Sequence, residues 1–251
     1  MVESLVGLAR TLGDPLAGMA ILAEGNVSGR ADEATFWVKA SGTSLSTLDE
    51  GGLVRVAFAP LLEALSLSLD DTGVRAVLSG SRVDAGVTAT PSVETFMHAY
   101  LLGLPEVGYV GHTHPTPLLS LLALEDAPSY ARQRMFPDEV VCCGPESPFV
   151  PYTDPGLPLA RAIQVAVEEY IAQWGAVPKT IWLGNHGLIA LGRSVAEVES
   201  ASRMAVKAAQ AWLGALATGR AIRPLTNAEV ERIHTRPDEH YRQRLLFQIK
   251  H

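Results

Sequence analysis

Two histidines separated by one residue end an apolar stretch, in the sequence GHTH at 111–114. Side chains alternate between the two faces of a β-strand, so residues two apart point to the same side. If this stretch is a strand, His112 and His114 present neighbouring imidazoles, and imidazole nitrogen is a preferred ligand of zinc. The same spacing fits two polar histidines at a strand end, so further ligands are needed to indicate a metal site.

A catalytic zinc site takes three protein ligands and keeps one position open. We predict His186, in GNHG, as the third ligand, because it follows an apolar segment and precedes a glycine that permits a sharp turn. An ordinary turn residue is the alternative. His98 is the competing third ligand, since it lies one helical turn after Glu94. We favour a hydrogen-bonded core histidine as the interpretation of His98.

Glu94 lies near the start of a helix that we expect Pro91 to open. A carboxylate there is stabilised by the helix dipole, and beside a metal it can also act as a general acid or base. Hydroxyl, amide and backbone groups suited to an anion occur at Asn26, Ser28, Ser41, Gly42 and Ser92, with Lys39 as a candidate cation. Taken singly, each of the polar residues is more often a cap or turn residue, and the alternative for Lys39 on a strand is that it faces solvent.

The elements that must position these residues read as interleaved strands and helices. We predict strands at 34–40, 107–114, 139–143 and 179–192, the last with a turn before 188. We predict helices at 1–22 with a break near Pro15, and at 58–66, 91–105, 118–124, 156–175, 194–218 and 226–233. Residues 23–30 and 41–48 read as loops and 68–90 as an exposed excursion. This order predicts an α/β protein with one domain over 1–251, in which 222–251 form a helical extension.

Composition narrows the classes of function. The formal net charge is −7 and no dense Lys/Arg block occurs, which argues against nucleic-acid and anionic-membrane partners. We expect no membrane-spanning helix and no signal peptide, because the N-terminus lacks a cationic start and no long apolar run follows. Cys142 and Cys143 are the only cysteines, and adjacent cysteines are poorly suited to a stabilising disulfide. We therefore expect a reducing, cytoplasmic location.

Five segments together resemble the landmarks of the class II aldolase/adducin family, in the family's order. They are GNVSGR (25–30), KASGTSL (39–45), PSVETFMH (91–98), GHTHP (111–115) and NHGLIALG (185–192). The resemblance covers about residues 1–220 and implies an α/β/α sandwich around a mainly antiparallel sheet. It also implies homotetramers with the site near a subunit interface, and zinc or another divalent ion such as Mn²⁺ or Co²⁺.

Carried over by position, the resemblance implies that His112, His114 and His186 hold the metal and that Glu94 is the catalytic acid/base. Asn26, Ser41, Gly42 and Ser92 match phosphate-binding positions. Two positions depart from the sugar-phosphate aldolases of the family, because Val93 and Ala23 stand where hydroxyl residues are usual. Lys39 is a candidate to compensate for them. Many members also use a C-terminal tyrosine as proton donor, for which Tyr241 is our candidate.

The function we expect is a metal-dependent aldolase that cleaves or forms a C–C bond in a hydroxy-ketone or sugar through an enediolate. Epimerisation and decarboxylation pass through the same kind of enolate, so the metal ligands alone do not separate these reactions. A non-catalytic binding protein of the adducin type is the third alternative. It gives no reason to keep three metal-spaced histidines together with Glu94. The substrate, and whether it is phosphorylated, stay open at this point.

Overall fold

The computed structural model describes residues 1–84 and 86–236, which are built around a seven-stranded sheet in the order β3-β2-β1-β4-β7-β6-β5. The strands are β1 (Asn26–Arg30), β2 (Thr35–Lys39), β3 (Leu53–Ala57), β4 (Tyr109–Thr113), β5 (Phe149–Val150), β6 (Thr180–Leu183) and β7 (Gly187–Gly192). Every neighbouring pair is antiparallel except β5 and β6, which are parallel. The predicted α/β class and mainly antiparallel sheet are therefore confirmed.

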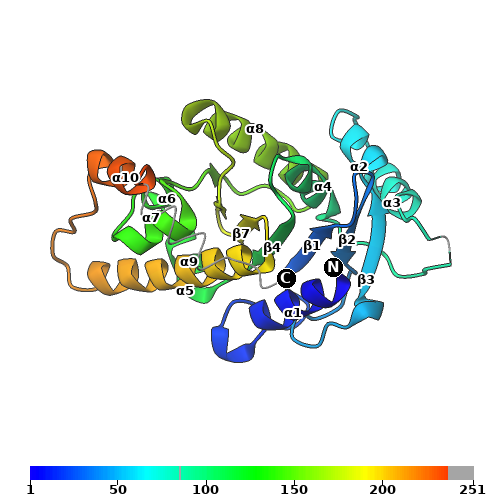
Figure 1. The fold of residues 1–251 in the computed structure, drawn as a ribbon, viewed down its shortest axis with the longest axis horizontal. Helices are drawn as coiled ribbons and strands as arrows, with labels where there is room; N and C mark the ends of the chain where they lie inside the picture. Colours follow the sequence, from blue (N-terminus) through cyan, green and yellow to red (C-terminus); the bar gives the residue numbers. More distant parts are fainter. Residues whose placement is uncertain (85, 237–251) are drawn as a thin grey trace.

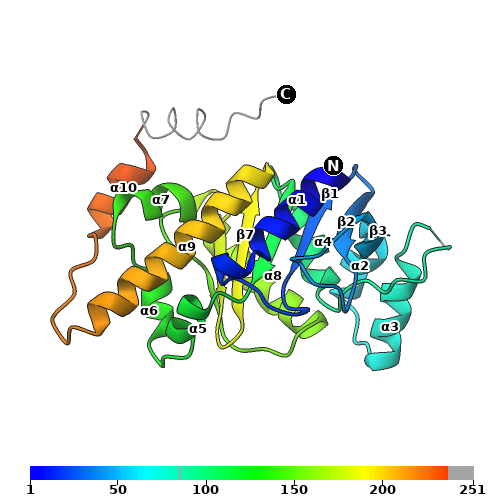
Figure 2. The ribbon, with the colours of Figure 1, turned by 90° about the horizontal axis from the view of Figure 1, so that it is seen from below.

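Helices cover both faces of the sheet (Figures 1 and 2). One face carries α2 (Phe58–Ala64), α4 (Thr95–Gly103) and α8 (Leu157–Trp174), with α3 (Asp71–Gly80) packed on α2. The other face carries α1 (Val2–Leu12), α5 (Thr116–Leu122) and α9 (Val195–Leu216). Helix α6 (Ala127–Ala131) packs on α5 and α7 (Pro137–Cys143) packs on α9, while α10 (Asn227–His234) packs on α7. Within the described part of the chain, no helix has the length and apolar character to cross a bilayer.

Strand register decides which side chains meet α4. Val110 of β4 is fully buried in the core cluster that also contains residues of α4 and α8. Because side chains alternate along a strand, His112 lies on the same face as Val110. Across the neighbouring strand, Asn26 pairs with His112 and Ser28 pairs with Val110. The sheet therefore places Asn26, Ser28 and His112 together on the face covered by α4.

The prediction of a strand at 139–143 is wrong, because these residues form the last part of α7. Pro137 occupies the first turn of this helix, and Asp138 and Glu139 follow it. Proline with its fixed φ and acidic side chains near the helix dipole both favour a helix start. These signals outweigh the strand preference of the two β-branched residues, Val140 and Val141.

Other segments in the N-terminal 220 residues also differ from the predicted secondary structure. Residues 26–30 form a central strand where a loop was expected, because their polar side chains find hydrogen-bond partners under α4. Residues 71–80 form a helix where an exposed excursion was expected, and the Asp70 side chain caps it by accepting from the Gly73 N–H. The expected helix at 1–22 ends at Leu12, and only the short 3-10 turn Pro15–Ala17 follows.

The helix that carries His98 begins later than predicted. It starts at Thr95 rather than at Pro91, which instead forms an isolated antiparallel bridge with Ala40. Glu94 is therefore the N-cap residue, immediately before the first residue of the helix, so its side chain does not belong to a face of the helix. Of the predicted C-terminal extension, α10 is present, and Tyr241 lies outside the described residues.

Candidate metal centre

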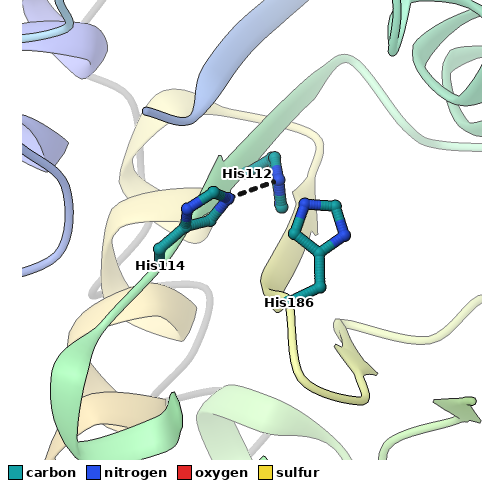
Figure 3. A group of neighbouring side chains, drawn as sticks. All are labelled: His112, His114 and His186. Atoms are coloured by element: carbon teal, nitrogen blue, oxygen red, sulfur yellow. Dashed lines mark hydrogen bonds between the residues drawn. The ribbon is translucent and has the colours of Figure 1, made fainter. Parts of the chain in front are cut away.

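Three imidazole rings turn toward one another at one end of the central strands (Figure 3). His112 lies in β4, His114 follows the last residue of β4, and His186 lies in the short turn between β6 and β7. The ring centroids are 4.8, 4.9 and 5.1 Å apart, and one ligand nitrogen from each ring lies within 4.8 Å of the others. The structure therefore brings together the three predicted ligands.

The turn that carries His186 depends on its neighbours. Asn185 has a φ of +51°, a left-handed conformation that asparagine tolerates better than most residues. Gly187 begins β7 directly against the end of β4, where an added Cβ would lie 2.5 Å from the Thr113 carbonyl oxygen. A glycine at this position thus permits the close approach that brings His186 to His112.

The hydrogen bond of His112 determines which of its nitrogens faces the cluster. Its Nδ1–H donates to the Leu188 carbonyl at 2.9 Å, so the lone pair of the neutral ring lies on Nε2. That Nε2 is 3.0 Å from Nε2 of His114. Two nitrogens bound to one tetrahedral zinc at the usual bond length lie about 3.3 Å apart. The observed separation is close to this value, so the pair fits a shared divalent ion.

Burial keeps the three rings neutral. It lowers the pKa of His112 to about 4, against the smaller effect of the hydrogen bond to Leu188. Burial, with the neighbouring His112, also lowers the pKa of His114 and His186 to about 4. Imidazole must be neutral to bind a metal, and at pH 7 all three rings are in that state. The donor set and its protonation state therefore fit a divalent metal ion.

Glu94 faces this cluster with two inequivalent oxygens. Its Oε2 accepts a hydrogen bond from Nδ2 of Asn26 at 2.6 Å and lies 3.6 Å from Nε2 of His112. Its Oε1 lies 3.3 Å from Nε2 of His186 and, among the described residues, has no hydrogen-bond donor. The carboxylate is thus held at one oxygen and free at the other, beside the three candidate ligands.

The loops predicted to bind an anion lie side by side next to Glu94. The Ser41 N–H donates to the Thr90 carbonyl at 2.8 Å, one residue beyond the bridge between Ala40 and Pro91. Ser92 is half-buried, and its Oγ accepts from the backbone N–H of Glu94 at 3.3 Å. Ser41 and Gly42 are exposed, and Gly42 has a φ of +78°. The bridge and these hydrogen bonds therefore join the loop after β2 to the segment that leads into Glu94.

Lys39 is buried under these loops rather than turned to solvent. Its ammonium donates to the backbone carbonyls of Thr43 at 2.6 Å, Ala40 at 3.4 Å and Ala23 at 3.5 Å. Burial lowers the pKa of Lys39, and the Glu94 carboxylate acts in the opposite direction. Lys39 thus connects the 40–43 loop to the segment before β1.

His98 is a fully buried core histidine that contacts Ser28 and Asn26, as we favoured from the sequence, and it is not one of the three clustered rings. Asn26 is 2% exposed, and both ends of its amide are engaged by Glu94 and His98. Sequence reasoning missed Glu24, whose carboxylate lies 3.9 Å from Nδ1 of His114. A carboxylate behind a ligand histidine is a common support of metal sites, but no spacing signal marks this one.

Comparison with known proteins places this chain in a family. The chain matches the model of the class II aldolase and adducin N-terminal domain over residues 3–213. No curated protein matches the sequence significantly.

Three solved structures share the fold at low sequence identity. The N-terminal class II aldolase domain of a Thermoplasma acidophilum protein is 24% identical, with a TM-score of 0.66 over 84% of this chain and 93% of that chain. YgbL of Escherichia coli, a candidate aldolase/epimerase/decarboxylase, is 22% identical with a TM-score of 0.66 over 93% and 97%. The L-fuculose-1-phosphate aldolase of Thermus thermophilus is 18% identical with a TM-score of 0.61 over 88% and 97%. With most of its length matched by the family model, this chain belongs to the class II aldolase and adducin N-terminal domain family.

Proposed function

We propose that this protein is a metal-dependent aldehyde-lyase that cleaves or forms a C–C bond in a hydroxy-ketone or sugar. The observation that carries the proposal is the convergence of three neutral histidines on a carboxylate with one unpaired oxygen. His112, His114 and His186 would hold the ion, with zinc as our first choice and Mn²⁺ or Co²⁺ as alternatives. When bound, such an ion supplies a Lewis acid that offsets the negative charge developing beside a carbonyl.

The chain's own groups then move the protons. In the cleavage direction the C–C bond breaks, its electron pair stays with the ketone fragment, and the hydroxyl of the other fragment loses its proton to become an aldehyde. Oε1 of Glu94 is the group we propose for protonating the carbanion carbon, since its Oε2 is already held by Asn26. For the hydroxyl proton we propose Tyr241, on the family resemblance alone.

We propose that an anionic group of the substrate, phosphate or carboxylate, lies between the loops of Ser41–Gly42 and Ser92. These residues offer hydroxyl and backbone donors near Glu94, and Lys39 adds a buried positive charge behind them. Val93, which is 50% exposed, puts an apolar side chain where a hydroxyl would strengthen this region. The Asn26 amide is directed at Glu94 and His98 and contributes indirectly.

Epimerisation and decarboxylation remain the second candidates, because both can use the same ligands and carboxylate. The similar YgbL structure is described in terms of all three reactions, which is the reason to test them together. A purely binding function does not account for the four convergent residues. The family resemblance further supports a homotetramer with the site near a subunit interface. The adjacent cysteines favour a cytoplasmic location, and the net charge favours a small molecule rather than nucleic acid or membrane as partner. Light scattering of the purified protein tests the tetramer.

Metal analysis combined with substrate screening tests the proposed reaction. We expect about one divalent ion per chain, and aldehyde release from members of a panel of phosphorylated and free ketoses and hydroxy-keto acids. Carbon dioxide release and epimer formation are measured in the same reactions and separate the three chemistries. We expect complete chelation to abolish the activity and restored zinc to return it. Activity that survives complete chelation, or a fully active Glu94→Gln variant, would contradict the proposal.

A further inference from the structure

A line of four side chains leads from the middle of the sheet to the candidate site. Ser28 Oγ lies 2.6 Å from Nδ1 of His98, Nε2 of His98 contacts Oδ1 of Asn26, and Nδ2 of Asn26 lies 2.6 Å from Oε2 of Glu94. Ser28 and Asn26 belong to β1, and His98 belongs to α4, which covers β1 (Figure 1). Ser28 and His98 are fully buried, Asn26 is 2% exposed, and Glu94 is 8% exposed.

The direction of each hydrogen bond in this line follows from the carboxylate. An ionised carboxylate only accepts hydrogen bonds, so the Asn26 NH₂ group must face Glu94 and the Asn26 oxygen must face His98. That oxygen requires a donor, so Nε2 of His98 carries the proton. Burial lowers the pKa of His98 to about 3, so at pH 7 the ring is neutral and its Nδ1 is an acceptor. The Ser28 hydroxyl supplies the donor for Nδ1, so each contact in the line joins one donor to one acceptor.

The other tautomer of His98 would break this arrangement. A lone pair on Nε2 would face the Asn26 oxygen, and the amide would relieve the repulsion by turning its oxygen toward Glu94. Oε2 of Glu94 would then face an acceptor instead of a donor, and the carboxylate would lose its tether. His98 thus decides the orientation of Asn26, and Asn26 decides which oxygen of Glu94 is held.

We infer that His98 is a positioning residue, which acts through Asn26 to tether Oε2 of Glu94 and leave Oε1 free, beside His186, as the oxygen that transfers the proton. This inference rests on the proposed function. A role in packing alone does not require this pattern, because the core cluster on this face of the sheet, which includes residues of α4, β2 and β4, is apolar. Buried polar groups cost free energy unless they are fully paired, so apolar residues would fill this space more simply.

Two substitutions of His98 separate positioning from packing. His98→Gln places an amide nitrogen near the position of Nε2 and can still donate to Asn26. His98→Asn places its amide near Nδ1, so it can reach Ser28 but not Asn26. Both variants are polar and both lose half of the ring's hydrogen bonds, so each is the matched control of the other. We expect both to unfold at similar temperatures, somewhat below the wild type.

Proton exchange measures the step assigned to Glu94. The zinc-loaded wild type and both variants are incubated with dihydroxyacetone or dihydroxyacetone phosphate in D₂O, and loss of the substrate C–H signal is followed by NMR. We expect a rate constant at saturation within about threefold of wild type for His98→Gln and about 10–100-fold lower for His98→Asn, the usual range for residues behind a metal site. KM and zinc content should stay unchanged, because Glu94 acts in the transition state.

A second readout needs neither substrate nor variant. In ¹⁵N-labelled wild type, long-range ¹H–¹⁵N spectra should show Nε2 of His98 protonated and Nδ1 as an acceptor, without change between pH 5 and 8. The opposite tautomer would overturn the inference, and so would equal exchange rates in His98→Gln and His98→Asn. A zinc-loaded wild type that exchanges neither probe, nor any ketose or hydroxy-keto acid of the screening panel, would instead overturn the proposed function, on which the inference depends.

Discussion

Two clusters in this molecule bury a carboxylate beside cationic or basic partners, and they differ in how completely the carboxylate is paired. In the first, Glu139 lies 3.8 Å from the guanidinium of Arg134, and both are 1% exposed. Arg134 also donates to Ser147 Oγ and to backbone carbonyls that include Gly144, and Glu139 accepts from the Met135 N–H at 2.8 Å. Every charge in this cluster has a partner, as expected for a group that only holds loops together.

In the second cluster, Glu94 and His186 are left incompletely paired. Among the described residues, only four buried side-chain nitrogens and oxygens have no hydrogen-bond partner, and two of them are Oε1 of Glu94 and Nδ1 of His186. An unpaired buried polar group is costly, so it persists where something other than the fold requires it. Complete pairing thus marks the structural cluster, and incomplete pairing beside metal-type donors marks the site.

The same substitution in each cluster should separate them most strongly. We expect Glu94→Gln to lower the turnover of the loaded protein about 10²–10⁴-fold, the usual contribution of a general acid or base, with little change in melting temperature. Glu139→Gln is the matched control and should keep the turnover per folded molecule. The measurement is the proton exchange rate at saturation together with thermal unfolding. Equal turnover losses in the two variants would remove the distinction between the clusters.

Removing the cation of the first cluster should affect stability alone. We expect Arg134→Met to lower the free energy of unfolding by about 3–5 kcal/mol, because it leaves Glu139 buried without its charge partner. Urea unfolding gives this value. The double variant Arg134→Met/Glu139→Met should recover part of the loss, since it removes the orphaned charge. A double variant less stable than Arg134→Met would show that the ion pair itself is not what the single substitution breaks.

Gly187 tests whether the ligands of the second cluster depend on close backbone approach. A Cβ there would lie 2.5 Å from the Thr113 carbonyl oxygen and 2.8 Å from Cδ2 of His114. We expect Gly187→Ala to weaken zinc affinity about 10–100-fold, measured by competition with a chelator. Gly214→Ala in α9 is the control, because the added methyl group meets nothing within 4 Å. It should raise stability by about 0.5–1 kcal/mol and leave zinc affinity unchanged.

The smallest expected effect is a pH dependence of stability that belongs to His98. Its pKa is about 3 in the fold and 6.5 ordinarily, so between these values the unfolded chain binds a proton that the folded chain does not. Stability is therefore fully present above pH 6.5 and falls as the pH is lowered, by up to about 1.4 kcal/mol per pH unit. His98→Gln lacks this proton and should lose less stability from pH 7.5 to 5 in urea unfolding. Parallel curves for the two proteins would contradict a buried neutral His98.

The strands and helices that were predicted correctly are those with strong local signals. The long helix α8 and the apolar strand β4 show clear periodicity. Helix α9 begins at the predicted place, where the Ser194 side chain accepts from the Glu197 N–H. Strand β1 was missed because Asn26, Ser28 and Gly29 are poor strand formers, and only their neighbours in the sheet make a strand there. Helix α7 was missed because its short apolar run with two β-branched valines is typical of a strand, although Pro137 and the two acidic residues after it favour a helix start.

Local sequence signals are enough to predict that His112 and His114 lie side by side as two candidate metal ligands, because strand alternation is a local property. They also indicate His186 and Glu94 as candidates, because the segments around them resemble one family in the same order. The three-dimensional arrangement was needed to show that these residues meet, that Asn26 and His98 are joined to Glu94, and that Oε1 rather than Oε2 is free. These features depend on the register of β1 against β4 and on how α4 packs against β1, and no local sequence pattern determines either of them.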